Sequence, residues 1–177
     1  MSKIDEILSA NIKPKEKQEI LVQAVLTSEI TTDEFFVFFE SARDVDKGSC
    51  ADAMKHISAS NPEILAPYIE VLIPYINYKS PRVKWGVPEA VGNMSKKFPK
   101  ETAKAVPYLL KNTTQNKENT TVIKWCAAFA LSEIVRNNPK TRAQLLPIFE
   151  DIARAEKNNG IKNVYLKALK AMKKGAA

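Results

Sequence analysis

The feature that most constrains how this chain folds is a pattern that recurs at a fixed spacing. The tripeptides Val83-Lys84-Trp85 and Ile123-Lys124-Trp125 stand 40 positions apart. Prolines recur at the same offset, at Pro67, Pro107 and Pro147 and again at Pro99 and Pro139. Such a period is typical of proteins built from stacked units, because one unit cannot bury its apolar face alone. The chain is therefore predicted to be a row of similar units.

Each unit is predicted to hold two helices. The first helix has the apolar spacing of a helix with one buried face, as in Val83, Val87, Ala90, Val91 and Met94 and in Ile123, Ala127, Ala130, Leu131 and Ile134. Ser80 and Pro81 are favoured residue types at a helix start, and the proline that follows each first helix marks its end. One position is always alanine, which predicts burial between closely approaching helices for Ala53, Ala90, Ala130 and Ala168.

The 177 residues fit a single domain. Within this domain, 1–177, we expect a degenerate N-terminal helix pair acting as a cap, three repeats and a C-terminal half-repeat that caps the other end, at 1–41, 42–76, 77–113, 114–153 and 154–177. The helices of the N-terminal pair are expected to run from Pro14 to Thr27 and from Thr32 to Arg43. The second of these helices carries a dense aromatic face, formed by Phe35, Phe36, Phe38 and Phe39.

These units resemble the HEAT-repeat family. In that pattern the first helix opens with Val-Arg and runs through alanines to Ala-Leu-Gly, and the second opens with Pro and aliphatic residues. Residues 83–92 resemble the first helix with Lys for Arg, and residues 123–132 do so with Lys for Arg and Ser for Gly. Pro107-Tyr108-Leu109-Leu110 resembles the second. The resemblance covers about 42–174 and implies an all-α, right-handed α-α superhelix, a HEAT-like solenoid of about nine to ten helices.

A column of lysines occupies one position of the repeat. HEAT repeats commonly hold a basic residue there, and the resemblance implies that it pairs with acidic or carbonyl groups of the neighbouring repeat. The alternative is a ladder of positive charge for phosphates or carboxylates. The members of the column are Lys47, Lys84, Lys124 and Lys162.

Composition argues against catalysis, metal binding and membrane insertion. His56 is the only histidine, no glycine-rich phosphate loop occurs, and no metal-spaced cluster is present. Cys50 and Cys126 lie far apart without a CxxC motif, as expected of buried thiols in a reducing compartment. No secretory signal or bilayer-spanning segment is evident. We expect a cytoplasmic protein that is not an enzyme and needs no cofactor or metal.

The leading functional hypothesis is a scaffold that binds a protein on the concave surface lined by the second helices. Candidate contacts on that surface are Tyr68, Glu70, Tyr75, Lys104, Tyr108, Lys111, Glu150 and Arg154. Trp85 and Trp125 share a column away from the main apolar stripe. They are expected either to pack between repeats or to anchor the partner, a role for which Trp is favoured.

A rival hypothesis is a DNA-binding protein or an alkylpurine DNA glycosylase. Trp85 followed four residues later by Glu89 is similar to the tryptophan and helical Asp of HEAT-like glycosylases, with Glu for Asp and without an arginine-rich groove. Pro88 interrupts the same helix and is expected to kink it.

The basic excess of the chain concerns its C-terminal end. Residues 154–177 hold seven basic side chains against one acidic one, so they carry +6 of the net charge of +7. The basic end consists of Lys162, Lys167, Lys170, Lys173 and Lys174. These lysines are expected either to form the water-exposed face of the terminal cap or to bind nucleic acid weakly and without sequence preference. We expect a monomer.

Overall fold

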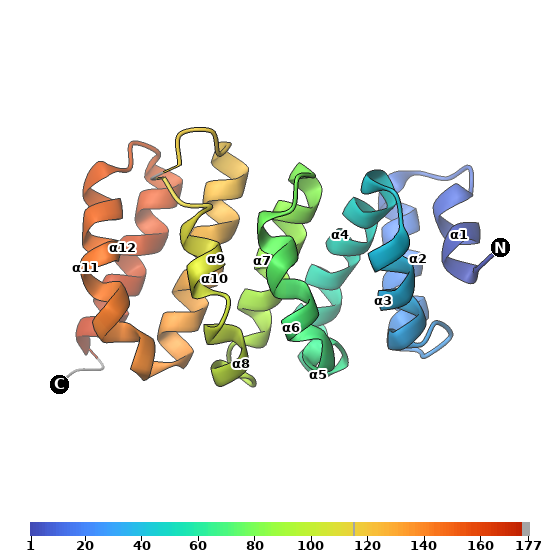
Figure 1. Ribbon diagram of the computed structural model, residues 1–177, viewed down its shortest axis with the longest axis horizontal. Coiled ribbons are helices and arrows are strands. Elements are labelled where there is room, and N and C mark those ends of the chain that lie inside the picture. Colours follow the sequence, from blue (N-terminus) through green and yellow to red (C-terminus); the bar gives the residue numbers. More distant parts are fainter. Residues whose placement is uncertain (115, 175–177) are drawn as a thin grey trace.

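The computed structural model describes residues 1–114 and 116–174, and this part of the chain is all-helical. Helices hold 79% of these residues, and none of them lies in a strand, which confirms the prediction of an all-α fold. The helices form two layers along an elongated molecule, with the two termini at opposite ends (Figure 1). Residue 115 of the third predicted repeat and residues 175–177 of the half-repeat lie outside the described residues.

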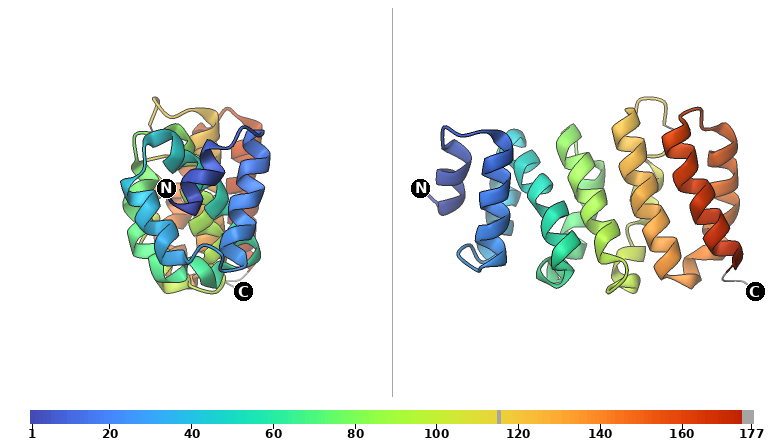
Figure 2. Two further views of the ribbon diagram at one scale, coloured as in Figure 1. Left: turned by 90° about the vertical axis from the view of Figure 1, so that its right-hand side faces the viewer. Right: turned by 180° about the vertical axis from the view of Figure 1, so that it is seen from behind.

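The first layer holds the helix that opens each unit. Its members lie side by side in chain order (Figure 2, right): α2 (Pro14–Leu26), α4 (Asp44–Ser60), α7 (Pro81–Met94), α10 (Thr121–Asn137) and α12 (Asn159–Lys174). The four alanines of the repeated column are fully buried, which confirms the register derived from them. Pro88 is also buried inside α7.

Small residues let helices of the first layer approach closely. A β-carbon on Gly86 of α7 would lie 2.3 Å from the carbonyl oxygen of Ala51 in α4. A β-carbon on Gly92 would lie 2.9 Å from the α-carbon of Ala130 in α10. Both distances are shorter than a carbon atom tolerates, so glycine is required where the helices cross.

The second layer holds shorter, interrupted helices. After α3 (Thr32–Ser41) it contains the consecutive segments α5 (Pro62–Leu65), η1 (Ala66–Tyr68), α6 (Ile69–Leu72) and η2 (Ile73–Asn77), then α8 (Pro99–Ala103) and α9 (Val106–Leu110), and finally η3 (Pro139–Thr141) and α11 (Arg142–Ala155). Pro67 and Pro74 lie inside η1 and η2, where a missing backbone N–H disfavours a regular α-helix. The described residues therefore form twelve α-helices and three 3-10 helices, where the sequence predicts about nine to ten helices.

A short helix that the repeat pattern does not predict, α1 (Lys3–Ser9), lies at the N-terminal end. Its start is fixed by a capping box, in which the Ser2 hydroxyl accepts from the Asp5 amide and the Asp5 carboxylate accepts from the Ser2 amide. Ile4 and Ile7 are buried beneath it. The expected helix pair that follows is present as α2 and α3.

Polar side chains tie neighbouring units together through backbone carbonyls. The Lys47 ammonium is buried and donates to the carbonyl oxygens of Phe39 at 2.5 Å and Glu40 at 2.7 Å. Lys47 thus shows the carbonyl pairing that the HEAT resemblance implies, whereas the other lysines of its column are only half-buried. In the second layer, the Asn112 amide donates to the Ile76 carbonyl at 2.7 Å. These bonds fix the register of one unit against the next.

Candidate partner-binding surface

The residues predicted to line the second helices lie on the second layer, but most are paired with each other or with their neighbours. Glu70 forms an ion pair with Lys104 of the next unit. The Lys111 ammonium lies 5.5 Å from the centre of the Tyr108 ring. At the C-terminal end, Arg154 pairs with Asp151 at 3.5 Å. The first of these contacts joins two units, whereas Tyr108 with Lys111 and Asp151 with Arg154 are neighbours three residues apart in the chain. Exposed ion pairs contribute little to stability.

The two remaining tyrosines of this set have a packing role. Tyr68 stacks on Phe36 with ring centres 3.9 Å apart, and its hydroxyl donates to Asp33. Tyr75 packs against Phe39 with ring centres 4.6 Å apart. Both rings join the aromatic face of α3 to the following unit, which accounts for these tyrosines without a partner.

The other face of the molecule carries an apolar cluster on the outer side of α7 and α10. Trp125 and Phe129, one helical turn apart, stack with their ring centres 5.7 Å apart and their planes at 10°. Trp125 is 38% exposed, and Val122, one turn before it, is 47% exposed. Residues three and four apart share one face of a helix, so these side chains form a continuous stripe. Together with Trp85 of α7, they are called here the aromatic patch.

Two contacts set the alignment of α7 and α10 beneath the patch. Phe129 lies against Gly92, and the Cys126 thiol donates to the Glu89 carboxylate at 3.4 Å. Each contact joins residues 37 positions apart, and the same offset places Val122 opposite Trp85 towards the helix starts. Trp85 therefore continues the stripe onto α7.

Trp85 and Trp125 differ in their surroundings. Trp85 is half-buried, and its indole N–H is buried without a hydrogen-bond partner among the described residues. Trp125 is 38% exposed and stacks on Phe129, so part of its ring is accessible to solvent.

Glu89 lies beside the patch but is engaged with a thiol. Burial raises the pKa of Cys126 strongly, and the charge of Glu89 raises it further. Burial also raises the pKa of Cys50, to about 12. Both cysteines therefore remain neutral thiols near neutral pH, which disfavours a nucleophilic role for either.

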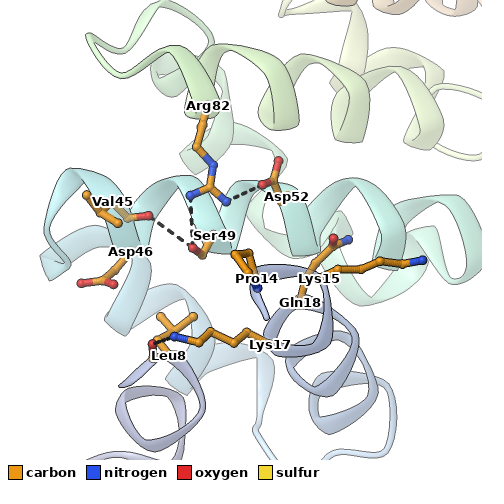
Figure 3. A pocket seen from close by; sticks show the side chains of 10 residues that line it. All are labelled: Leu8, Pro14, Lys15, Lys17, Gln18, Val45, Asp46, Ser49, Asp52 and Arg82. Atoms are coloured by element: carbon orange, nitrogen blue, oxygen red, sulfur yellow. Dashed lines mark hydrogen bonds and ion pairs between the residues drawn. The ribbon is translucent and has the colours of Figure 1, made fainter. Parts of the chain in front are cut away.

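A separate cavity of about 340 Å³ lies between α1, α2 and α4, with Arg82 of α7 above it (Figure 3). The Arg82 guanidinium pairs with Asp52 at 2.6 Å, and the Lys17 ammonium donates to the Leu8 carbonyl at 2.7 Å. The other charged groups at the rim, Lys15 and Asp46, have partners in Glu19 and Arg43. The charged groups that line this cavity are therefore paired, and the Arg82–Asp52 contact joins α7 to α4.

Other kinds of site find little support in the part of the chain that the structure describes. No group of three His, Cys, Asp or Glu side chains there is placed to hold a metal ion. His56 is exposed on α4. None of the described helices is both long enough and apolar enough to cross a bilayer.

Comparison with solved structures identifies a similar fold. No protein-family model matches the chain, and no curated protein matches it. A crystal structure of an engineered protein from the Northeast Structural Genomics Consortium superposes with a TM-score of 0.73 at 16% identity, covering 97% of this chain and 78% of the other. At this identity the likeness concerns the fold alone.

Sequence reasoning singled out the two tryptophans but missed Val122 and Phe129. Phe129 stands four residues after Trp125, the spacing at which aromatic side chains meet on a helix. Val122 stands three residues before Trp125 and does not disturb the repeated apolar pattern, so nothing in that pattern draws attention to it. A search for apolar residues outside the buried stripe of residues 121–137 finds both of them.

Proposed function

We propose that this chain is a non-catalytic scaffold that holds a protein partner, built as a right-handed HEAT-like solenoid. The recurring sequence pattern and the two-layer row of helices support this architecture. The buried, unpaired cysteines Cys50 and Cys126 fit a reducing compartment such as the cytoplasm.

The observation that carries the proposal is the aromatic patch. An exposed Trp ring that stacks on a second aromatic ring is a rigid apolar anchor, and Trp is enriched among the residues that dominate protein interfaces. The patch lies on α7 and α10, helices of 14 and 17 residues, so its geometry is set before a partner arrives. In the second layer, in contrast, charged and aromatic side chains such as Glu70, Lys104 and Tyr68 form contacts between units.

The charges beside the patch favour a protein over a nucleic acid. Glu89 of α7 and Glu133 of α10 are half-buried on the same outer side, and Arg136 pairs with Glu133 at 2.7 Å. A phosphate backbone on this face would meet both carboxylates, and like charges repel. We therefore expect the occupant to present apolar side chains to Trp125 and a basic or neutral rim to the glutamates.

Truncation of Trp125 to alanine should separate binding from folding. Since Trp125 is 38% exposed, losing its ring contact should cost only about 1 kcal/mol of unfolding free energy. Loss of an interface anchor should weaken partner binding by at least about 2 kcal/mol, roughly 30-fold. A thermal melt measures the first quantity, and titration of the partner recovered from the native cell measures the second.

Tyr108→Ala provides the matched control, because it removes an aromatic ring from the second layer. The proposal expects it to leave partner affinity unchanged within about twofold. If Tyr108→Ala abolishes binding and Trp125→Ala does not, the partner binds the second layer. If Trp125→Ala costs about 3–5 kcal/mol of stability, the ring is part of the core.

A further inference from the structure

The last helix of the first layer leaves exposed a side that its predecessor buries. Four residues of α10 are at most 2% exposed: Ala128, Leu131, Ser132 and Val135. The repeat pattern relates α10 to α12 by 38 positions, since Ile123 matches Ile161 and Ala130 matches Ala168. The counterparts in α12 are therefore Leu166, Leu169, Lys170 and Lys173.

This side of α12 is both apolar and basic. Leu166 is 45% exposed although its counterpart in α10 is fully buried, and Leu169 lies at its base. With Lys170, Lys173 and Lys174 these leucines line an open hollow, called here the C-terminal face. Lys173 pairs with Glu150 of α11 at 3.2 Å, and neither Lys170 nor Lys174 forms an ion pair among the described residues. If this side of α12 only had to be soluble at the end of the row, it would not need a leucine at the position whose counterpart in α10 is buried.

The opposite end of the molecule has the complementary character. A hollow of about 340 Å³ between α1 and α3 has apolar residues in its lining, including Val37, which is 68% exposed. Its charged lining residues are Asp5, Glu29 and Glu34 against one base, Lys3, which pairs with Glu29 at 2.7 Å. Residues 1–41 hold eight acidic side chains against four lysines, a net charge of −4. This site is called here the N-terminal hollow.

We propose that a second copy of this chain docks head to tail, with its C-terminal face on the N-terminal hollow of the first. Two C-terminal faces would oppose lysine with lysine, and two N-terminal hollows would oppose carboxylate with carboxylate. Only the head-to-tail arrangement joins opposite charges and covers Leu166 and Val37 together. Because two different surfaces meet, each added copy presents a free end, so the contact builds rings or filaments.

The contact is small and charged, so it should be weak and sensitive to salt. It goes beyond the proposed function, because the aromatic patch is carried by α7 and α10 within the row, whereas α1 and α12 lie towards its two ends (Figure 1). Copies joined in this way would display their aromatic patches in series. The expectation of a monomer stays a prediction, and the experiment below decides between it and this contact.

Charge exchange between the two ends tests the contact. Lys170→Glu with Lys174→Glu reverses the C-terminal face, and Glu29→Lys with Val37→Lys reverses the N-terminal hollow. All four positions are exposed, so folding should be preserved, which circular dichroism checks. Sedimentation velocity across a concentration series at low and high salt measures the association.

The wild-type chain should show a weight-average mass that rises with concentration and falls to the monomer value in high salt. Each reversed variant alone should stay monomeric, and an equimolar mixture of the two should associate again. Lys96→Glu with Lys100→Glu is the matched control, since it changes the same charge far from both ends and should associate like the wild type. A wild type that stays monomeric at low salt, a control that fails equally, or a mixture that does not recover would each overturn the proposal.

Discussion

Replacing Gly86 by valine should destabilise the fold by at least about 3 kcal/mol, the upper end of what overpacking usually costs. The first added carbon would lie 2.3 Å from the backbone oxygen of Ala51 and 2.9 Å from its β-carbon. No rotation of a side chain relieves a clash with a backbone atom, so α4 and α7 must move apart. Urea unfolding of the purified variant measures the loss.

Gly160→Ala is the control for this substitution. Gly160 lies in the first turn of α12, and the nearest atom to an added β-carbon is the side-chain oxygen of Asn158 at 3.1 Å. Alanine favours helix over glycine by about 1 kcal/mol, so we expect stability to change by less than that. Equal losses at both glycines would mean that α4 and α7 do not cross at Gly86.

Tyr165→Ala should cost about 3–5 kcal/mol of unfolding free energy. The Tyr165 ring is fully buried in α12 and packs edge-on against Phe149 of α11, with ring centres 5.0 Å apart. This contact joins the terminal helix to the layer beneath it. Removal of the ring leaves a cavity that the ends of two helices must collapse to fill.

Tyr165→Phe should change the unfolding free energy in the opposite direction. It distinguishes the contribution of the ring from that of its hydroxyl. The hydroxyl is buried and has no hydrogen-bond partner among the described residues, and burial raises its pKa. Removing an unsatisfied buried polar group should leave stability unchanged or raise it by about 1 kcal/mol. A loss of more than about 1 kcal/mol in Tyr165→Phe would show that the hydroxyl has a partner in solution.

The repeated helices of the first layer were predictable because their pattern rests on burial. The column that contains Ala90 and Ala130 fixes the register of each helix, and both residues are fully buried. The interruptions of the second layer follow from Pro67 and Pro74, but the choice between one bent helix and four short segments depends on packing. The N-terminal α1 has only seven residues, too few for a period to show.

The candidate surface was predictable only in part. The repeat spacing of 40 residues identifies Trp85 and Trp125 as equivalent positions, but it does not predict which of the two rings is buried. That depends on the approach of α7 to α10, which Gly92 permits by accepting Phe129 against its backbone. The pairing of Glu70 with Lys104 likewise follows from the stacking of the units, since opposite charges 34 positions apart carry no local signal.

The central claim, a protein partner held on the aromatic patch, is tested most directly by photo-crosslinking in the native cell. A benzophenone side chain placed at Val122, which is 47% exposed, should capture one protein, and Trp125→Ala in the same chain should abolish the product. Lys111 is exposed at the C-terminal end of α9 in the second layer. The same group placed there should capture no protein. Capture from Lys111 alone, or no protein captured from Val122, would contradict the claim.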